Sequence, residues 1–103
     1  MIKKSLNKPE DCRNIDDIRY EIDLVDNQVI WLIAQRAQYV KEAAKFKKSE
    51  NAVRDEERVK KVIESKKQLA LEYNISPDLI GEIYKTMIEY FVNQELDEWE
   101  KVK

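Results

Sequence analysis

Apolar residues recur along the first half of the chain at alternating steps of three and four positions. They occupy a seam made of Ile15, Ile18, Ile22, Val25, Val29, Leu32, Arg36, Tyr39, Ala43 and Phe46. This spacing is typical of one long α-helix with a buried face. Nine of the ten positions are apolar or aromatic, and the tenth is Arg36. Because burying an unpaired cation costs several kcal/mol, we expect an anion beside Arg36, supplied either by an internal carboxylate or by a ligand.

Two shorter helices are expected after the long one. The first helix begins near Ile15, where acidic residues suit the helix dipole, and continues to residue 47 or 48, before the polar break at 49–52. The second begins near Arg54 and stops at Asn74, a residue type that tolerates the left-handed conformation. The residues of this helix predicted to face inward are Val59, Val62, Ile63, Leu69 and Tyr73.

The third helix has a clear start signal. Ser76 is suited to the N-cap, Pro77 to the first helical position, and the helix is expected to continue to about Trp99. Its predicted buried side chains are Ile80, Tyr84, Met87, Ile88, Phe91 and Trp99. With no internal repeat or linker, the pattern predicts one all-α domain over residues 1–103.

The length of the first helix bears on the oligomeric state. About 32 residues at roughly 1.5 Å each give a helix close to 50 Å long, whereas a compact 100-residue domain has a radius of gyration of about 13 Å. In a monomer such a helix would protrude with its seam exposed. We therefore expect an intertwined homodimer in which two long helices pair.

The composition excludes several kinds of site. Charged residues make up 39% of the chain with a net charge of −2, which does not favour a nucleic-acid or membrane partner. The absence of histidine and the single Cys12 exclude Ser-His-Asp and Cys-His catalysis, zinc sites with histidine ligands and internal disulfides, and we expect no metal. Gly81 is the only glycine, so no phosphate-binding loop is present. With no apolar leader and no bilayer-spanning run, a cytoplasmic location is expected.

Several charged residues stand at positions that could form one site. Arg36 and Lys47 are eleven positions apart, which places them within about 20° on one helix face. Arg19 lies seventeen residues before Arg36, roughly 25 Å along the axis, so an antiparallel partner helix would have to deliver it. Arg58 is a further candidate. Glu95 shares the interior spacing of the third helix and is a second charge where an apolar residue is expected.

Motifs along nearly the whole chain resemble the all-α class of chorismate mutases, and within it the isochorismate pyruvate lyases. The matching segments are Pro9-Glu10-Asp11-Cys12, Asp17-Ile18-Arg19, Ile22-Asp23, Asp26, Tyr39-Val40-Lys41, Phe46-Lys47, Ser49-Glu50 and Glu57-Arg58-Val59. The spacing of the four cations Arg19, Arg36, Lys47 and Arg58 is specific to this superfamily, although it does not separate mutase from lyase.

This resemblance implies a cofactor-free enzyme that acts on a dicarboxylate with an enolpyruvyl ether, either isochorismate or chorismate. Both reactions are pericyclic, so catalysis would come from holding a reactive conformer and stabilising charge on the ether oxygen. By similarity, Arg36 and Arg19 from the partner chain would hold the carboxylates, and Lys47 would contact the ether oxygen. Arg58 would anchor the ring carboxylate, and Val92 would line the substrate site.

Two departures from the family pattern affect the expected chemistry. Glu95 stands where the family typically has glutamine donating to the ether oxygen, and a glutamate can donate only when it is protonated. Asp55 resembles the mutases, where an aspartate frames the hydroxyl site, but Val59 resembles the lyase. We expect a lyase with mutase side activity, and the alternative is a dedicated mutase. The segment 49–53 is a candidate lid because it lies between Lys47 and Arg58.

Simpler interpretations remain open for single residues. Arg36 could be a structural cation paired with Glu95 or Asp55, and Glu95 could extend to the surface near a helix end. Arg19 and Lys47, taken singly, are typical of solvated charges. A helical dimerisation module would explain the seam but not its interior charges, and a regulatory domain of a larger aromatic-biosynthesis enzyme is a third alternative.

Overall fold

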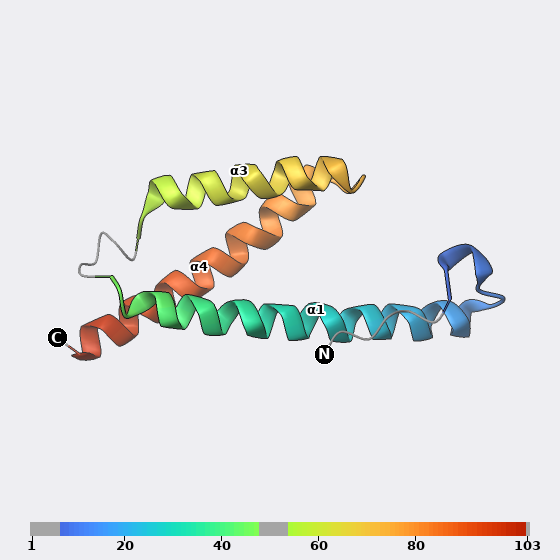
Figure 1. The fold of residues 1–103 in the computed structure, drawn as a ribbon, viewed down its shortest axis with the longest axis horizontal. Coiled ribbons are helices and arrows are strands. Elements are labelled where there is room, and N and C mark those ends of the chain that lie inside the picture. Colours follow the sequence, from blue (N-terminus) through green and yellow to red (C-terminus); the bar gives the residue numbers. More distant parts are fainter. Residues whose placement is uncertain (1–6, 48–53, 103) are drawn as a thin grey trace. The chain divides into compact units, whose positions relative to one another are not determined.

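The computed structural model describes residues 7–47 and 54–102, and in this part of the chain every regular element is helical (Figure 1). A short 3-10 helix, η1 (Pro9–Asp11), precedes the α-helices α1 (Ile15–Ala44), α3 (Glu56–Glu72) and α4 (Pro77–Val102). The predicted all-α fold with a very long first helix is therefore confirmed. The candidate lid at residues 49–53 lies outside the described residues.

The start of α1 is fixed by a reciprocal pair of hydrogen bonds. The backbone N–H of Asp17 donates to Oδ1 of Asn14 at 2.9 Å, and the backbone N–H of Arg13 donates to Oδ2 of Asp17 at 3.0 Å. The first contact satisfies a donor that the first turn of the helix leaves without an intrahelical partner, and the second ties the residue before Asn14 to that turn. The 30 residues of α1 give a length of about 45 Å.

The end of α1 differs from the prediction of residue 47 or 48. The backbone N–H groups of Lys45, Phe46 and Lys47 donate to carbonyls only three residues earlier. These i→i−3 bonds tighten the chain into a turn, so the α-helix ends at Ala44. Lys47 therefore lies in this turn and not in α1. The prediction that Arg36 and Lys47 share one face of a continuous helix is wrong.

The predicted stop of α3 and start of α4 are confirmed, with small shifts in the bounds, and Asn74 adopts a φ of 58° after α3. The Asp55 side chain, which was not predicted to be a cap, accepts from the backbone N–H of Arg58 at 3.1 Å and so caps α3. Oγ of Ser76 accepts from the backbone N–H of Leu79 at 3.2 Å. Because α4 extends to Val102, it is longer than the predicted helix.

The chain divides into two compact units, Met1–Tyr39 and Val40–Lys103, and α1 passes from the first into the second. In the second unit α3 packs against α4, and Lys66 Nζ lies 5.8 Å from the ring centroid of Tyr84. In these two helices Ala70, Ile88 and Leu96 are buried, and Ile80, Met87 and Phe91 are half-buried.

Two residues predicted to face inward from α3 are exposed. Leu69 and Tyr73 are 42% and 74% exposed, because within the protomer α4 covers only one stripe of α3. Val59, Val62 and Ile63 are half-buried, as expected for residues on that stripe. The side chain of Trp99 lies outside the described part of the structure.

The seam of α1 is open within one protomer. Its central residues Ile22, Val25 and Leu32 are 51%, 48% and 48% exposed, and Tyr39 is 75% exposed. The α1 helix thus carries an apolar face that the described residues of its own chain cover only in part. None of the helices in the described residues is long and apolar enough to cross a membrane.

Gly81 offers a test of the α3–α4 packing. A Cβ at this buried helical position would lie 2.6 Å from Cε of Lys67, which is the movable end of a long side chain. Replacing a helix-interior glycine by alanine contributes about 1 kcal/mol, and part of this gain offsets the displacement of Lys67. We expect Gly81→Ala to raise the free energy of unfolding in urea by less than about 1 kcal/mol. A marked loss of stability that Lys67→Ala does not relieve would contradict this account of the contact.

Candidate active site

A buried ion pair joins the end of α1 to α4 inside the second unit. Nζ of Lys47 donates to Oε2 of Glu95 at 3.0 Å, and the two side chains are 27% and 7% exposed. Glu95 lies on the interior face of α4, next to the buried Leu96. The alternative that Glu95 extends to the surface is therefore wrong, and the two residues predicted to be catalytic lie in contact.

The other predicted cations lie elsewhere on the helices. Arg36 is half-buried and Arg19 is exposed, and both belong to the first unit. Arg58 is exposed in the first turn of α3, beside the carboxylate of Asp55. That carboxylate caps α3, so Asp55 has a structural role whatever its part in binding.

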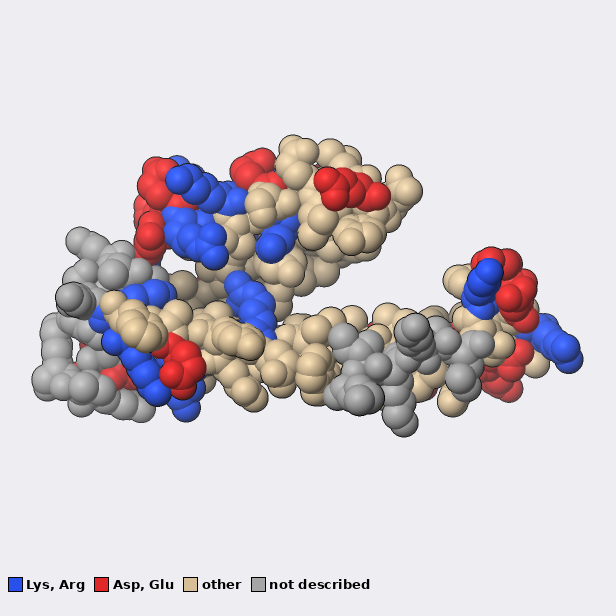
Figure 2. Space-filling model, in the orientation of Figure 1, with Lys and Arg blue, Asp and Glu red and all other residues tan. Residues whose placement is uncertain are grey.

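A groove in the second unit contains further candidate residues. This α3–α4 groove has a volume of about 620 Å³, with Val59, Ile88 and Val92 as its apolar residues. Its polar residues are Arg54, Glu56, Lys60, Lys85, Glu89 and Asn93. Figure 2 shows Lys and Arg side chains gathered along the first half of α3. Two of the predicted substrate-binding residues are thus associated with this groove. Val92 lines it, and Arg58 lies in the adjoining first turn of α3.

The sequence interpretation missed the cations of this groove. Lys85, Ile88, Glu89 and Val92 follow one another at steps of three, one and three along α4, so they share a helix face. That spacing is a signal that could have placed Lys85 beside the predicted Val92. Lys60 follows Val59 directly on α3, and only the packing of the two helices brings it to the same groove.

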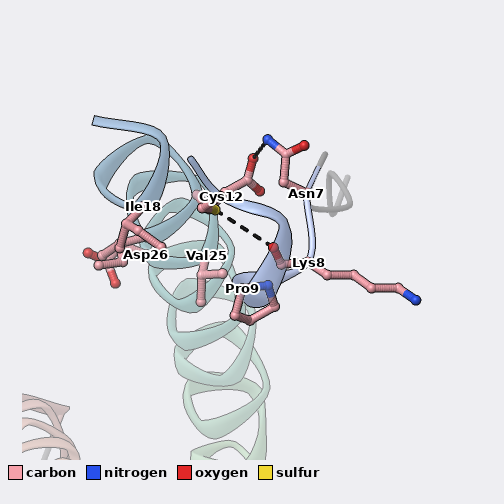
Figure 3. A pocket seen from close by; sticks show the side chains of 9 residues that line it. Asn7, Lys8, Pro9, Cys12, Ile18, Val25 and Asp26 are labelled. Atoms are coloured by element: carbon pink, nitrogen blue, oxygen red, sulfur yellow. Dashed lines mark hydrogen bonds between the residues drawn. The ribbon is translucent and has the colours of Figure 1, made fainter. Parts of the chain in front are cut away.

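A second groove lies in the first unit, between η1 and α1 (Figure 3). It has a volume of about 670 Å³ and contains Glu21, which is only 8% exposed and accepts a hydrogen bond from Nδ2 of Asn7 at 3.3 Å. The sequence interpretation missed this buried acid, because position 21 lies off the seam.

Cys12 lines the same groove, and its Sγ donates to the carbonyl oxygen of Lys8 at 3.7 Å. Burial raises the pKa of the Cys12 thiol, and the nearby carboxylates of Asp17 and Glu21 raise it further. The thiol is therefore protonated and weakly nucleophilic at neutral pH.

The chemistry available to these residues is electrostatic. In the described ranges no cluster of three or more His, Cys, Asp or Glu side chains could hold a metal ion. The Lys47–Glu95 pair offers an ammonium donor beside a carboxyl group that is only 7% exposed. Donors fixed in such surroundings can stabilise charge that develops on a substrate oxygen.

Comparisons with known proteins agree with this chemistry. The family model described as Chorismate mutase type II matches residues 18–96. The chain is 28% identical over 98 residues to an isochorismate pyruvate lyase of Pseudomonas aeruginosa, covering 95% of this chain and 97% of the relative. It is 31% identical over 75 residues to a chorismate mutase of Methanocaldococcus jannaschii, covering 72% of this chain and 76% of that relative. The resemblance found from the sequence motifs is thereby confirmed, and the chain belongs to the chorismate mutase type II family.

Proposed function

We propose that this chain is an isochorismate pyruvate lyase with chorismate mutase side activity. The observation that carries the proposal is the buried contact between Lys47 and Glu95, which supplies donors for an ether oxygen without any nucleophile. The choice of lyase over mutase is supported by the lyase relative, whose similarity spans nearly the full length of both chains. Val59, which lines the α3–α4 groove, supports the same choice.

In the proposed reaction the ether C–O bond of isochorismate breaks while a ring hydrogen moves to the enolpyruvyl methylene carbon. The ring becomes the aromatic ring of salicylate, and the side chain leaves as pyruvate, so no external acid, base or oxidant is consumed. Lys47 Nζ donates to the ether oxygen as negative charge builds there. Arg36, Arg58 and Arg19 of the partner subunit hold the two carboxylates, and Val92 packs against the ring.

The proposal includes a homodimer with shared active sites. Its support is the exposed apolar seam of α1, which is about 45 Å long and about half open at its centre. A contiguous apolar surface of this kind is typical of an interface between protein chains. A second copy of the chain offers an equally long apolar face, and an antiparallel arrangement would deliver Arg19 to the partner's site.

A dedicated chorismate mutase is the second candidate. It is favoured by Asp55, which resembles the mutases, and by the chorismate mutase relative from Methanocaldococcus jannaschii. A helical dimerisation module without activity explains the seam, but it gives no reason for a buried Lys47–Glu95 pair.

A paired assay of the purified protein tests the proposal. Isochorismate is followed by salicylate fluorescence, and chorismate by the loss of its absorbance. We expect salicylate to form well above the mutase rate. Prephenate formation alone would identify a dedicated mutase and make Asp55 a better guide than Val59. Turnover of neither substrate would overturn the enzymatic proposal and return Arg36 to a structural role.

A further inference from the structure

The first turn of α3 is held at its N-terminus by Asp55. Oδ1 of Asp55 accepts from the backbone N–H of Arg58 at 3.1 Å, and its backbone carbonyl accepts from the N–H of Val59 at 3.0 Å. The backbone of Asp55 is itself not helical, with φ −43° and ψ 89°, as is usual for an N-cap residue. One residue thus supplies two hydrogen-bond acceptors to the turn that carries Arg58.

Packing contributes little to this turn. Residues 54–58 are all exposed, and the first residue of α3 with partial burial is Val59, which lines the α3–α4 groove. A helical turn without buried side chains depends on its local hydrogen bonds, because helix formation by itself is marginal in water. The backbone position of Arg58 therefore depends on the cap, and the direction of its side chain follows from that backbone.

The cap also determines where the Asp55 carboxylate lies. A carboxylate bonded to the N–H three residues later stays against the end of its own helix. Arg54 and Glu56 are among the residues that line the α3–α4 groove, but Asp55 between them is not. The geometry thus gives this carboxylate a partner in the backbone of α3 and directs it away from the groove that Val92 lines.

We propose that Asp55 is a positioning residue that acts through Arg58 and makes no contact with the ring hydroxyl of the substrate. This inference rests on the proposed function, in which Arg58 holds a substrate carboxylate. Isochorismate and chorismate carry the same two carboxylates and differ in the ring positions of the hydroxyl and the ether. An ordered Arg58 serves both substrates alike, so loss of the cap should lower both activities by the same factor.

Three substitutions of Asp55 in the full-length chain separate a cap from a substrate contact. Asp55→Ala removes the cap, so Arg58 is in its binding position for a smaller fraction of the time. We expect kcat/KM for isochorismate to fall about three- to tenfold, mainly through KM. Asp55→Ser and Asp55→Asn regain a capping oxygen without the negative charge, and we expect them to restore kcat/KM to within about twofold of wild type.

The order of these variants decides the proposal. The serine side chain is too short to replace a carboxylate at a substrate hydroxyl, but it is as good an N-cap as aspartate. Asp55→Ser with a loss as large as that of Asp55→Ala would therefore overturn the proposal. Wild-type kcat/KM in Asp55→Ala would overturn it as well.

Ser76 provides a matched control for general stability. Its Oγ caps α4 through the same kind of bond, to the backbone N–H of Leu79 three residues later, at 3.2 Å. Ser76→Ala should lower the free energy of unfolding in urea about as much as Asp55→Ala does, but it should leave kcat/KM within about twofold of wild type. Equal losses of kcat/KM in the two variants would assign the effect to general stability and overturn the proposal.

A second background tests whether Asp55 acts through Arg58. Arg58→Gln removes the guanidinium but keeps the backbone N–H that donates to the cap. In this background Asp55→Ala should change kcat/KM, measured at high enzyme concentration, by less than about twofold, because the group that the cap positions is already missing. An undiminished effect of Asp55→Ala would overturn the route through Arg58.

The two substrates distinguish this inference from the proposed function. Asp55→Ala should lower kcat/KM for isochorismate and for chorismate by factors that agree within about twofold. A change confined to one substrate would place Asp55 at the hydroxyl and overturn this inference alone. If the wild type forms only prephenate, the proposed lyase activity fails, and the order of the Asp55 variants with chorismate still tests the cap. Turnover of neither substrate by the wild type would overturn the proposed function and the role of Arg58 with it.

Discussion

Replacing Lys47 with methionine is expected to lower kcat/KM for salicylate formation by about 10²–10³-fold, the usual effect of removing one donor from a developing oxyanion. Methionine keeps the unbranched stem of lysine but has no ammonium group to donate. In the structure Lys47 is the residue whose Nζ contacts Glu95 at 3.0 Å, so its loss also removes the counter-ion of a carboxylate that is 7% exposed. The rate should be measured with saturating and limiting isochorismate, so that kcat and KM are separated.

The loss of the counter-ion calls for a control on stability. Leaving a buried charge without its partner typically costs about 3–5 kcal/mol, and the partial exposure of Lys47 reduces this figure. The double variant Lys47→Met with Glu95→Gln removes both charges and should recover most of the free energy of unfolding. Its activity should stay low, because the donor from Lys47 is still missing. Full recovery of kcat/KM in the double variant would show that Lys47 serves the fold and not the reaction.

Glu95 is expected to limit hydrogen-bond donation to the ether oxygen. In the structure Glu95 accepts a hydrogen bond from Lys47, which is a contact of its carboxylate form. To donate to the ether oxygen, the side chain must first take up a proton. We therefore expect a side chain that donates at this position without taking up a proton to raise kcat for salicylate formation.

Glu95→Gln should raise kcat by about tenfold or more, because the amide N–H₂ donates to the ether oxygen and the amide oxygen can still accept from Lys47. Glu98→Gln is the matched control, since Glu98 is exposed on the same helix one turn later. An unchanged kcat in Glu95→Gln would remove Glu95 from the mechanism.

The helices of this protein could be predicted because their signals are local. The predicted cap formed by Ser76 connects atoms three residues apart, and Asn74 ends α3 through its own φ angle. The long seam of α1 is likewise a repeat within one helix. The spacing of apolar residues on α4 predicted that Glu95 faces the interior. The resemblance to family motifs selected Arg19, Arg36, Lys47 and Arg58 as candidate site residues.

Other features depend on contacts between distant parts of the chain. Lys47 and Glu95 are 48 residues apart, and only the packing of α4 near the end of α1 brings them to 3.0 Å. No local apolar pattern predicts the turn that ends α1 at Ala44. The same holds for the burial of Glu21, which accepts a hydrogen bond from Asn7. Helix propensity and capping act over a few residues, so the helices follow from local sequence. Burial and charge pairing depend on which surfaces meet, so the residues that share a site are set by the packing of distant segments.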